Sequence, residues 1–343
     1  MTYQTLSRDW LLLALVASLS AVADNAAAVA VNIDFGLVDN HPDGSTTAVF
    51  TGTAAAPVGG TTWNGVNVTD NSVFTGSEGE FGFWTANATV NNLLNSQGVA
   101  TTLTVTAVAS PTKTGVFGVR DNGPNIGRIA TNAVDLMRDY LIGFDNEPQS
   151  VVLGGFTPGT LVDLYLYGAG DQTIRDTTFT ITDSVKTHTA ITTGIPQNQG
   201  AHTLIEGGDY VVVRGVQANA TGQINIIYTG GGGSNEAPFN GLQAVFYPNA
   251  VPGDTDADGD VDFADYENIR SNFRNTGATR SQGDLANASG VGFGDGVVDF
   301  HDFVQWQEHF PTMGPSAATF VTPEPSTAVM TIAAIGLVAR RRR

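Results

Sequence analysis

Residues 254–265 read Asp-Thr-Asp-Ala-Asp-Gly-Asp-Val-Asp-Phe-Ala-Asp and carry six carboxylates in twelve positions. The acids occupy positions 1, 3, 5, 7, 9 and 12, with Gly259 at position 6 and Val261 at position 8. Alternate side chains of a tight loop can point at one centre, while the glycine permits a sharp turn and the valine anchors the loop to a core. Carboxylates this close repel one another unless a cation lies among them. The pattern predicts a Ca²⁺ loop of the EF-hand type; a solvated acidic linker would need neither the glycine nor the valine in register.

A second copy of this pattern follows at an offset of 37 residues. Nine positions between 258 and 273 match the type of the corresponding positions between 295 and 310. The apolar members after each loop are three or four residues apart, so they line one face of a helix. Each copy is therefore predicted to be a loop followed by a helix, and the two helices can bury their aromatic faces against each other.

The second loop begins irregularly. Asp284 matches Asp254 at an offset of 30, so the second loop has seven additional residues, roughly 288–294. In the 37-residue register its positions 1 and 3 would be apolar, but Asp284 and Asn287 can supply ligands if the insertion bulges outward. Whether this loop holds an ion stays open. The predicted Ca²⁺ ligands are Asp254, Asp256, Asp258, Asp260 and Asp265 in the first loop and Asp284, Asn287, Asp295 and Asp302 in the second.

This pair of loop–helix units, residues 253–312, resembles a type I dockerin. Aspartate rather than glutamate at position 12 and the missing entering helix fit that family. The resemblance implies a small α-helical, calcium-binding module over 250–312 and a cohesin-like protein as partner. In cellulosomal members, positions 10 and 11 are often a Ser-Thr pair that contacts the cohesin. Here they are Phe263-Ala264 and Phe300-His301, so the calcium fold carries over while the docking partner stays open.

The composition excludes several classes of function. The chain has 33 acidic and 15 basic residues, for a net charge of -18, and residues 254–310 contribute -9 of it from twelve acids and three arginines. A nucleic-acid partner would need a basic face, so none is expected. The absence of cysteine excludes disulfides, thiolate catalysis and cysteine-ligated zinc.

The N-terminus has the pattern of a secretory signal peptide. An apolar run over residues 10–19 follows Arg8 and precedes Ala-x-Ala triplets. We expect residues 1–23 to be removed by cleavage after Ala23, with Ala30 as the alternative site. A buried N-terminal helix is the competing interpretation.

The C-terminus has the order of parts of a sorting signal. Pro323-Glu324-Pro325 precedes thirteen mostly apolar residues and an arginine cluster at 340–343. Thirteen helical residues span about 20 Å, short of the roughly 30 Å bilayer core. The order nevertheless resembles the PEP-CTERM signal of Gram-negative bacteria. That resemblance implies a linker over 313–322, a sorting tail over 323–343 that touches the membrane only transiently, and cutting by an exosortase-type peptidase. The mature protein would then be secreted or lie at the cell surface.

Residues 31–249 are predicted to form a mainly β domain. Apolar and polar residues alternate in several stretches separated by Gly, Pro, Asn and Asp, which is typical of antiparallel strands. Ala133 to Leu141 has helical spacing instead. We expect an antiparallel, jelly-roll-like β-sandwich, followed by the small α-helical module, with the strands near Val31 and Leu242 paired. The order of the chain's parts resembles a class of planctomycete-type exported proteins. The alternating stretches are Val31, Ile33 and Phe35; Val162, Leu164 and Leu166; Phe179 and Ile181; Ile224, Ile226 and Tyr228; and Leu242, Ala244 and Phe246.

No catalytic signature stands out in this domain. The five histidines lack paired metal spacing, and there is no Gly-x-Ser-x-Gly elbow or P-loop. Trp63 and Trp84 could stack on sugars, although a sandwich tryptophan more often lies in the core. We therefore favour a non-enzymatic, surface-associated protein whose sandwich binds extracellular polysaccharide or an envelope component. The alternative is a glycan-active hydrolase attached through its dockerin-like module, although no spacing singles out a pair among its candidate acids. Those acids are Glu78, Glu80, Asp163, Asp171, Asp176 and Glu206.

Overall fold

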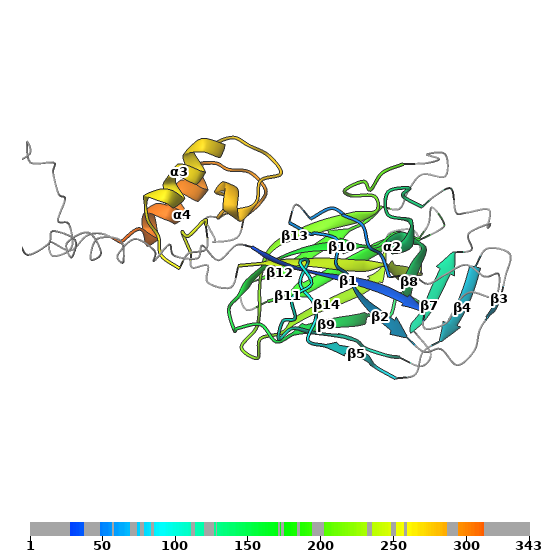
Figure 1. Cartoon of the computed structure of the whole chain (residues 1–343). Coiled ribbons are helices and arrows are strands. Elements are labelled where there is room, and N and C mark those ends of the chain that lie inside the picture. Colours follow the sequence, from blue (N-terminus) through cyan, green and yellow to red (C-terminus); the bar gives the residue numbers. More distant parts are fainter. Residues whose placement is uncertain are drawn as a thin grey trace, which may run out of the picture. The chain divides into compact units, whose positions relative to one another are not determined.

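The named strands, β1 to β16, all belong to three sheets in a computed structural model of the chain (Figure 1). The structure describes residues 28–37, 49–56, 58–68, 74–75, 79–83, 86–110, 114–119, 127, 129–170, 172, 175–183, 186–193, 202–231, 235–247, 252–256, 259–286 and 294–311. The first sheet has the order β13 (Tyr210–Gln217), β10 (Leu161–Tyr167), β16 (Gly241–Phe246), β1 (Val29–Leu37) and β2 (Asn64–Val68). The second has the order β12 (Thr187–Ile191), β11 (Thr177–Thr182), β14 (Ile224–Gly230), β9 (Gln149–Gly154), β6 (Thr104–Ala107) and β5 (Ala88–Asn91). The third has the order β15 (Ala237–Phe239), β8 (Asp139–Gly143), β7 (Thr114–Val119), β4 (Gly79–Phe83) and β3 (Phe74–Thr75).

The predicted mainly β, antiparallel character is confirmed, with one exception. The expected pairing of the first and last strands is present, since β1 runs antiparallel to β16 with Ile33 opposite Leu242. The exception is β2, which pairs with β1 in parallel.

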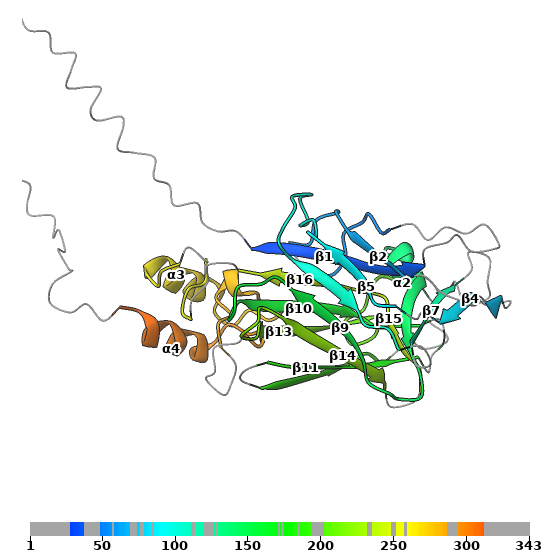
Figure 2. The same ribbon diagram turned by 90° about the horizontal axis from the view of Figure 1, so that it is seen from below.

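The first two sheets pack face to face over a common apolar core (Figure 2). Ile33 and Leu166 of the first sheet and Val151 and Ile226 of the second belong to it, all essentially inaccessible to solvent. Such core side chains occupy every second position of their strands, because alternate residues of a strand face the same side of the sheet. This arrangement makes the large domain a β-sandwich.

Phe239 of β15 joins the third sheet to this core. Its ring lies 5.0 Å from Phe35, 4.9 Å from Phe179 and 5.3 Å from Tyr228, centroid to centroid. The first two contacts are edge-to-face, the geometry in which a ring's positive edge meets a negative face.

The helix predicted from Ala133 to Leu141 is shorter in the structure. Helix α2 spans Val134–Arg138, and Asp139 already has extended backbone dihedrals. Tyr140 and Leu141 belong instead to β8, in which all five residues are buried. A strand covered on both faces is apolar without alternation, so its sequence resembles that of a buried helix.

A second apolar cluster covers the outer face of the first sheet. It contains Trp63, 7% exposed, whose ring nitrogen donates to the Gly52 carbonyl over 2.9 Å. Trp63 is thus a core residue and offers no stacking surface to a sugar, whereas Trp84 lies outside the described residues.

Two helices and a short 3₁₀ turn follow the sandwich. These are α3 (Phe263–Asn272), η2 (Arg280–Gln282) and α4 (Phe300–His309). Sandwich and helices belong to one unit, Met1–His309, and Phe310–Arg343 form a second. Within the described residues, no helix is long and apolar enough to cross a membrane. The predicted signal peptide and sorting tail lie outside those residues.

Candidate metal centre

The first acidic loop brings three of its predicted ligands together. One carboxylate oxygen from each of Asp254, Asp256 and Asp265 lies within 4.8 Å of the other two. Asp254 is fully buried and Asp265 is 1% exposed, while Asp256 is half-buried. Buried carboxylates this close need a cation or shared protons to offset their repulsion. The cluster can therefore hold a metal ion.

Backbone amides fix the position of Asp265. Its Oδ1 accepts from the Thr255 amide over 2.6 Å and from the Thr255 hydroxyl over 2.9 Å, and its Oδ2 accepts from the Asp262 amide over 2.7 Å. Asp262 is the N-cap of α3 and accepts from the Ala264 amide over 2.6 Å. This reciprocal capping box joins the loop to the helix, so position 12 is held by the start of α3.

Gly259 and Val261 have the roles expected from the pattern. Gly259 has φ +96°, a conformation that favours glycine, and its amide donates to Asp254 over 3.1 Å. Val261 is 6% exposed. The exposed Asp260 and Asp262 form a second group with the buried Asp265, and Asp258 lies outside the described residues.

The second loop repeats this hydrogen-bond pattern around Asp284 and Asp302. Asp302 accepts from the amides of Leu285 (2.6 Å), Ala286 (2.8 Å) and Asp299 (2.6 Å), as Asp265 does in the first loop. This equivalence places Asp284 at position 1 of the second loop.

The Gly296 turn completes that equivalence. Gly296 has φ +87° and donates to Asp284 over 2.8 Å, as Gly259 does to Asp254. Gly296 thus occupies the position in the second loop that Gly259 occupies in the first.

The described ligand set of the second loop differs from that of the first. The residue equivalent to Asp256 is Ala286, which offers no side-chain oxygen, and Asn287 lies outside the described residues. Asp295 is exposed, and its amide donates to Asp284 over 2.9 Å. Within the described part of the chain, no group of three acids forms in this loop. Burial raises the pKa of Asp284 to about 7, with Asp302 adding to the rise.

The helices after the two loops pack through their aromatic faces, as predicted. Tyr266 of α3 lies 5.2 Å from the Trp306 ring and 6.1 Å from the Phe303 ring of α4. The Trp306 ring nitrogen donates to the Asp262 carbonyl over 2.7 Å, so the second helix also holds the end of the first loop. At position 10 of each loop, Phe263 and Phe300 are 59% and 64% exposed.

A cavity of about 200 Å³ lies beside the helical part. Its walls include Asp163, Tyr165 and Tyr247 of the sandwich together with Ser281 and Gln282 of the helical part. Among its described lining residues only Asp163 has a carboxyl group, whereas glycoside hydrolysis needs two.

The comparisons with known proteins are sparse. No protein family and no curated protein matches the chain. Among solved structures, a similar one is TmCBM61 in complex with β-1,4-galactotriose, with 11% sequence identity, a TM-score of 0.20, and coverage of 42% of this chain and 83% of that one. A likeness this weak carries no argument about what the present chain binds.

Proposed function

We propose that residues 250–312 form a dockerin-like module that binds one Ca²⁺ ion in the first loop of an exported, surface-associated protein. The observation that carries this proposal is the convergence of Asp254, Asp256 and Asp265 on one point. The donors are carboxylate oxygens, which suit a hard cation such as Ca²⁺. Asp258 and Asp260 complete the proposed ligand set.

A bound ion would stabilise the module by neutralising its buried acids. Asp265 is the third residue of α3, so an ion at its carboxylate would also hold the first turn of that helix. The affinity expected for such a loop lies between about 10⁻⁷ and 10⁻³ M.

Asp265→Asn tests the calcium site. This change keeps the size of residue 265 and one of its two accepting oxygens but removes its charge, so it should abolish most of the calcium-dependent rise in melting temperature. Titration calorimetry and thermal unfolding of residues 24–322, with calcium and with EDTA, measure the effect. Glu267→Gln, an exposed acid on the same helix, is the matched control and should keep the full calcium response. Equal calcium responses of the two variants would refute the site.

The proposed export rests on both ends of the chain. We infer that residues 1–23 direct secretion, that 323–343 direct sorting through a PEP-CTERM-type signal, and that an exosortase-type peptidase cuts near the Pro-Glu-Pro tripeptide. Intact-mass measurement of the protein from its native envelope tests this inference. A mature species that retains residues 1–23 and 340–343 would refute it.

The proposed partner of the module is a cohesin-like protein. The exposed rings of Phe263 and Phe300 support a protein-binding surface at position 10, where cellulosomal dockerins contact their cohesins. Replacing both residues with serine should weaken binding to that partner without changing the calcium affinity.

The proposed ligand of the sandwich is a polysaccharide. The cavity of about 200 Å³ is lined by Tyr165, Tyr247, Gln282 and Asp163, whose hydroxyl, amide and carboxyl groups can hydrogen-bond a sugar. A polysaccharide array probed with residues 24–322 tests this. Retention of intact glycan supports binding, and release of reducing ends would favour the alternative, a glycan hydrolase.

A further inference from the structure

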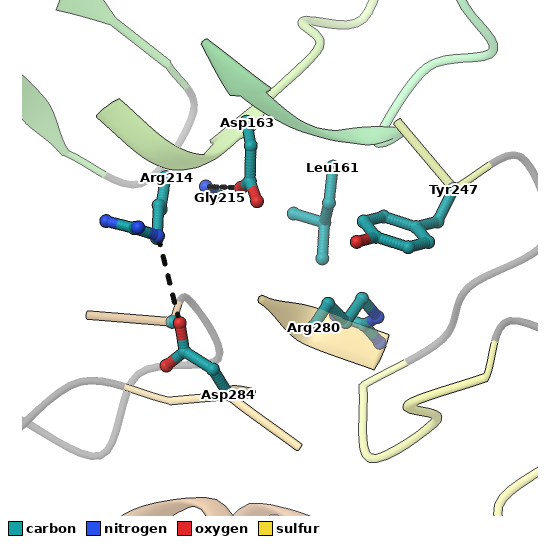
Figure 3. A pocket seen from close by; sticks show the side chains of 8 residues that line it. Leu161, Asp163, Arg214, Gly215, Tyr247, Arg280 and Asp284 are labelled. Carbon is teal, nitrogen blue, oxygen red and sulfur yellow. Dashed lines mark hydrogen bonds and ion pairs between the residues drawn. The ribbon is translucent and has the colours of Figure 1, made fainter. Parts of the chain in front are cut away.

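An arginine of the sandwich faces the second acidic loop. Arg214 lies on β13, and its Nε is 4.0 Å from Oδ2 of Asp284, whose side chain is 1% exposed. Figure 3 shows this ion pair, drawn as a dashed line between the sandwich and the loop. A Cβ added to Gly296 would lie 3.2 Å from Nη1 of Arg214, so the guanidinium rests against the glycine turn of the loop. The loop thus already has a cation beside its position-1 carboxylate.

Backbone amides hold the position-1 carboxylate of the second loop, much as they hold Asp265 in the first loop. Asp284 accepts from the amides of Asp295 and Gly296 on its two different oxygens. With Ala286 at position 3, the described part of the loop brings no three acids together as the first loop does. A guanidinium suits this arrangement because it delivers one positive charge and needs no complete oxygen shell.

A second arginine, Arg280, belongs to the helical part and interacts with the sandwich. Arg280 of η2 is buried, and its charge interacts with Asp163 of the sandwich as well as with Asp254 of the first loop. Arg214 and Arg280 both line a cavity of about 20 Å³, room for about one water molecule, together with Asp163 and Tyr247 (Figure 3). The contact between the sandwich and the helical part is therefore close and rich in charged side chains.

We propose that the second loop is a binding site for the Arg214 guanidinium rather than for a metal ion, and that this contact attaches the helical module to its own sandwich. The assignment of one ion per chain rests on the proposed function of the first loop. The attachment through Arg214 does not depend on it.

Hydrogen exchange of the full chain tests the attachment. Arg214→Gln should speed exchange of the amides of Leu285, Ala286 and Gly296 by about three- to tenfold, because one charged partner of the loop is lost. Arg214→Lys, which keeps the charge, should restore part of the protection. The matched control Arg270→Gln removes an exposed arginine paired with Glu267 and should leave these amides unchanged. Unchanged exchange in Arg214→Gln would overturn the proposal.

Calcium stoichiometry decides what the second loop binds. Asp284→Asn should leave the number of bound Ca²⁺ ions per full chain unchanged, and loss of one ion would overturn the inference. Asp265→Asn, measured in parallel, should lose one ion. If it loses none, the proposed function of the first loop is wrong, while the Asp284→Asn result still decides the assignment of the second.

Discussion

Gly296 and Gly277 both have positive φ, +87° and +69°, but their surroundings differ. A Cβ at 277 would meet nothing within 4 Å, whereas one at 296 would approach the Arg214 guanidinium. Gly277→Ala should cost about 1–2 kcal/mol of stability from backbone strain alone. Gly296→Ala should cost more, because the arginine must also move. Urea unfolding of the calcium-loaded chain measures both, and equal losses would show that Arg214 does not rest against this turn.

Asp34 of β1 is a buried acid whose ionisation opposes folding. Burial raises its pKa well above the usual value; the hydrogen bond from the Phe50 amide opposes this rise, and Asp139 and Asp135 add to it. The folded state therefore binds its proton more tightly than the unfolded state, where the pKa is about 3.9. The resulting stability is fully present below about pH 4 and is lost as pH rises toward the folded-state pKa.

Asp34→Asn should remove this loss of stability at higher pH. The variant should match the parent near pH 4 and become more stable than it at higher pH, with the difference growing by at most about 1.4 kcal/mol per pH unit. Asparagine can still accept the hydrogen bond from Phe50, which is 2.8 Å long in the parent. Urea unfolding at pH 4 and pH 7.5 measures the difference. A difference that does not depend on pH would contradict the assignment to Asp34.

At the scale of elements, a buried polar network holds the segment 49–63 against the first sheet. Gln243 of β16 accepts from the Ala56 amide over 2.9 Å and from the Tyr167 hydroxyl over 2.5 Å, and it donates to Asn32 over 2.9 Å. Gln243→Ala would leave these buried groups unpaired and should cost about 2–4 kcal/mol in urea unfolding. The exposed Gln223→Ala should change stability by less than about 0.5 kcal/mol. Similar losses in both variants would refute the role of the network.

The elements that could be predicted from the sequence were those in which apolar and polar residues alternate strictly. The alternation around Val31 and Leu242 predicted two strands and their pairing, because one face of each is apolar. The stretch from Ala133 to Leu141 was predicted wrongly at its end, since β8 is buried on both faces and loses the alternation that distinguishes a strand.

The candidate site was predictable where its ligands are close in sequence. Spacing alone placed Asp254, Asp256 and Asp265 together, because all three lie in one loop. Spacing could not place Arg214, which is 70 residues before Asp284 and comes near it only through the fold. A lone arginine on a strand has no sequence signal that separates it from a solvated surface charge.

At the scale of the molecule, the apolar cores and the proposed ion belong to different parts of the chain. Neither of the sandwich's two apolar clusters contains a residue beyond Tyr247. The helical part instead packs around Tyr266 and Trp306 and around the acids of its loops. The sandwich should therefore fold without calcium, and the helical module should depend on it.

Removing calcium from the whole protein tests this division. Scanning calorimetry should show two transitions, of which EDTA lowers the one that belongs to the module and leaves that of the sandwich nearly unchanged. Calcium at 100 times its dissociation constant should stabilise the module by about 2.7 kcal/mol. Circular dichroism at the helical bands identifies the module's transition, and Asp265→Asn should place it at the same temperature with and without EDTA. If EDTA lowers the sandwich transition by as much as that of the module, the two parts unfold together, and the ion stabilises the whole chain rather than its helical end.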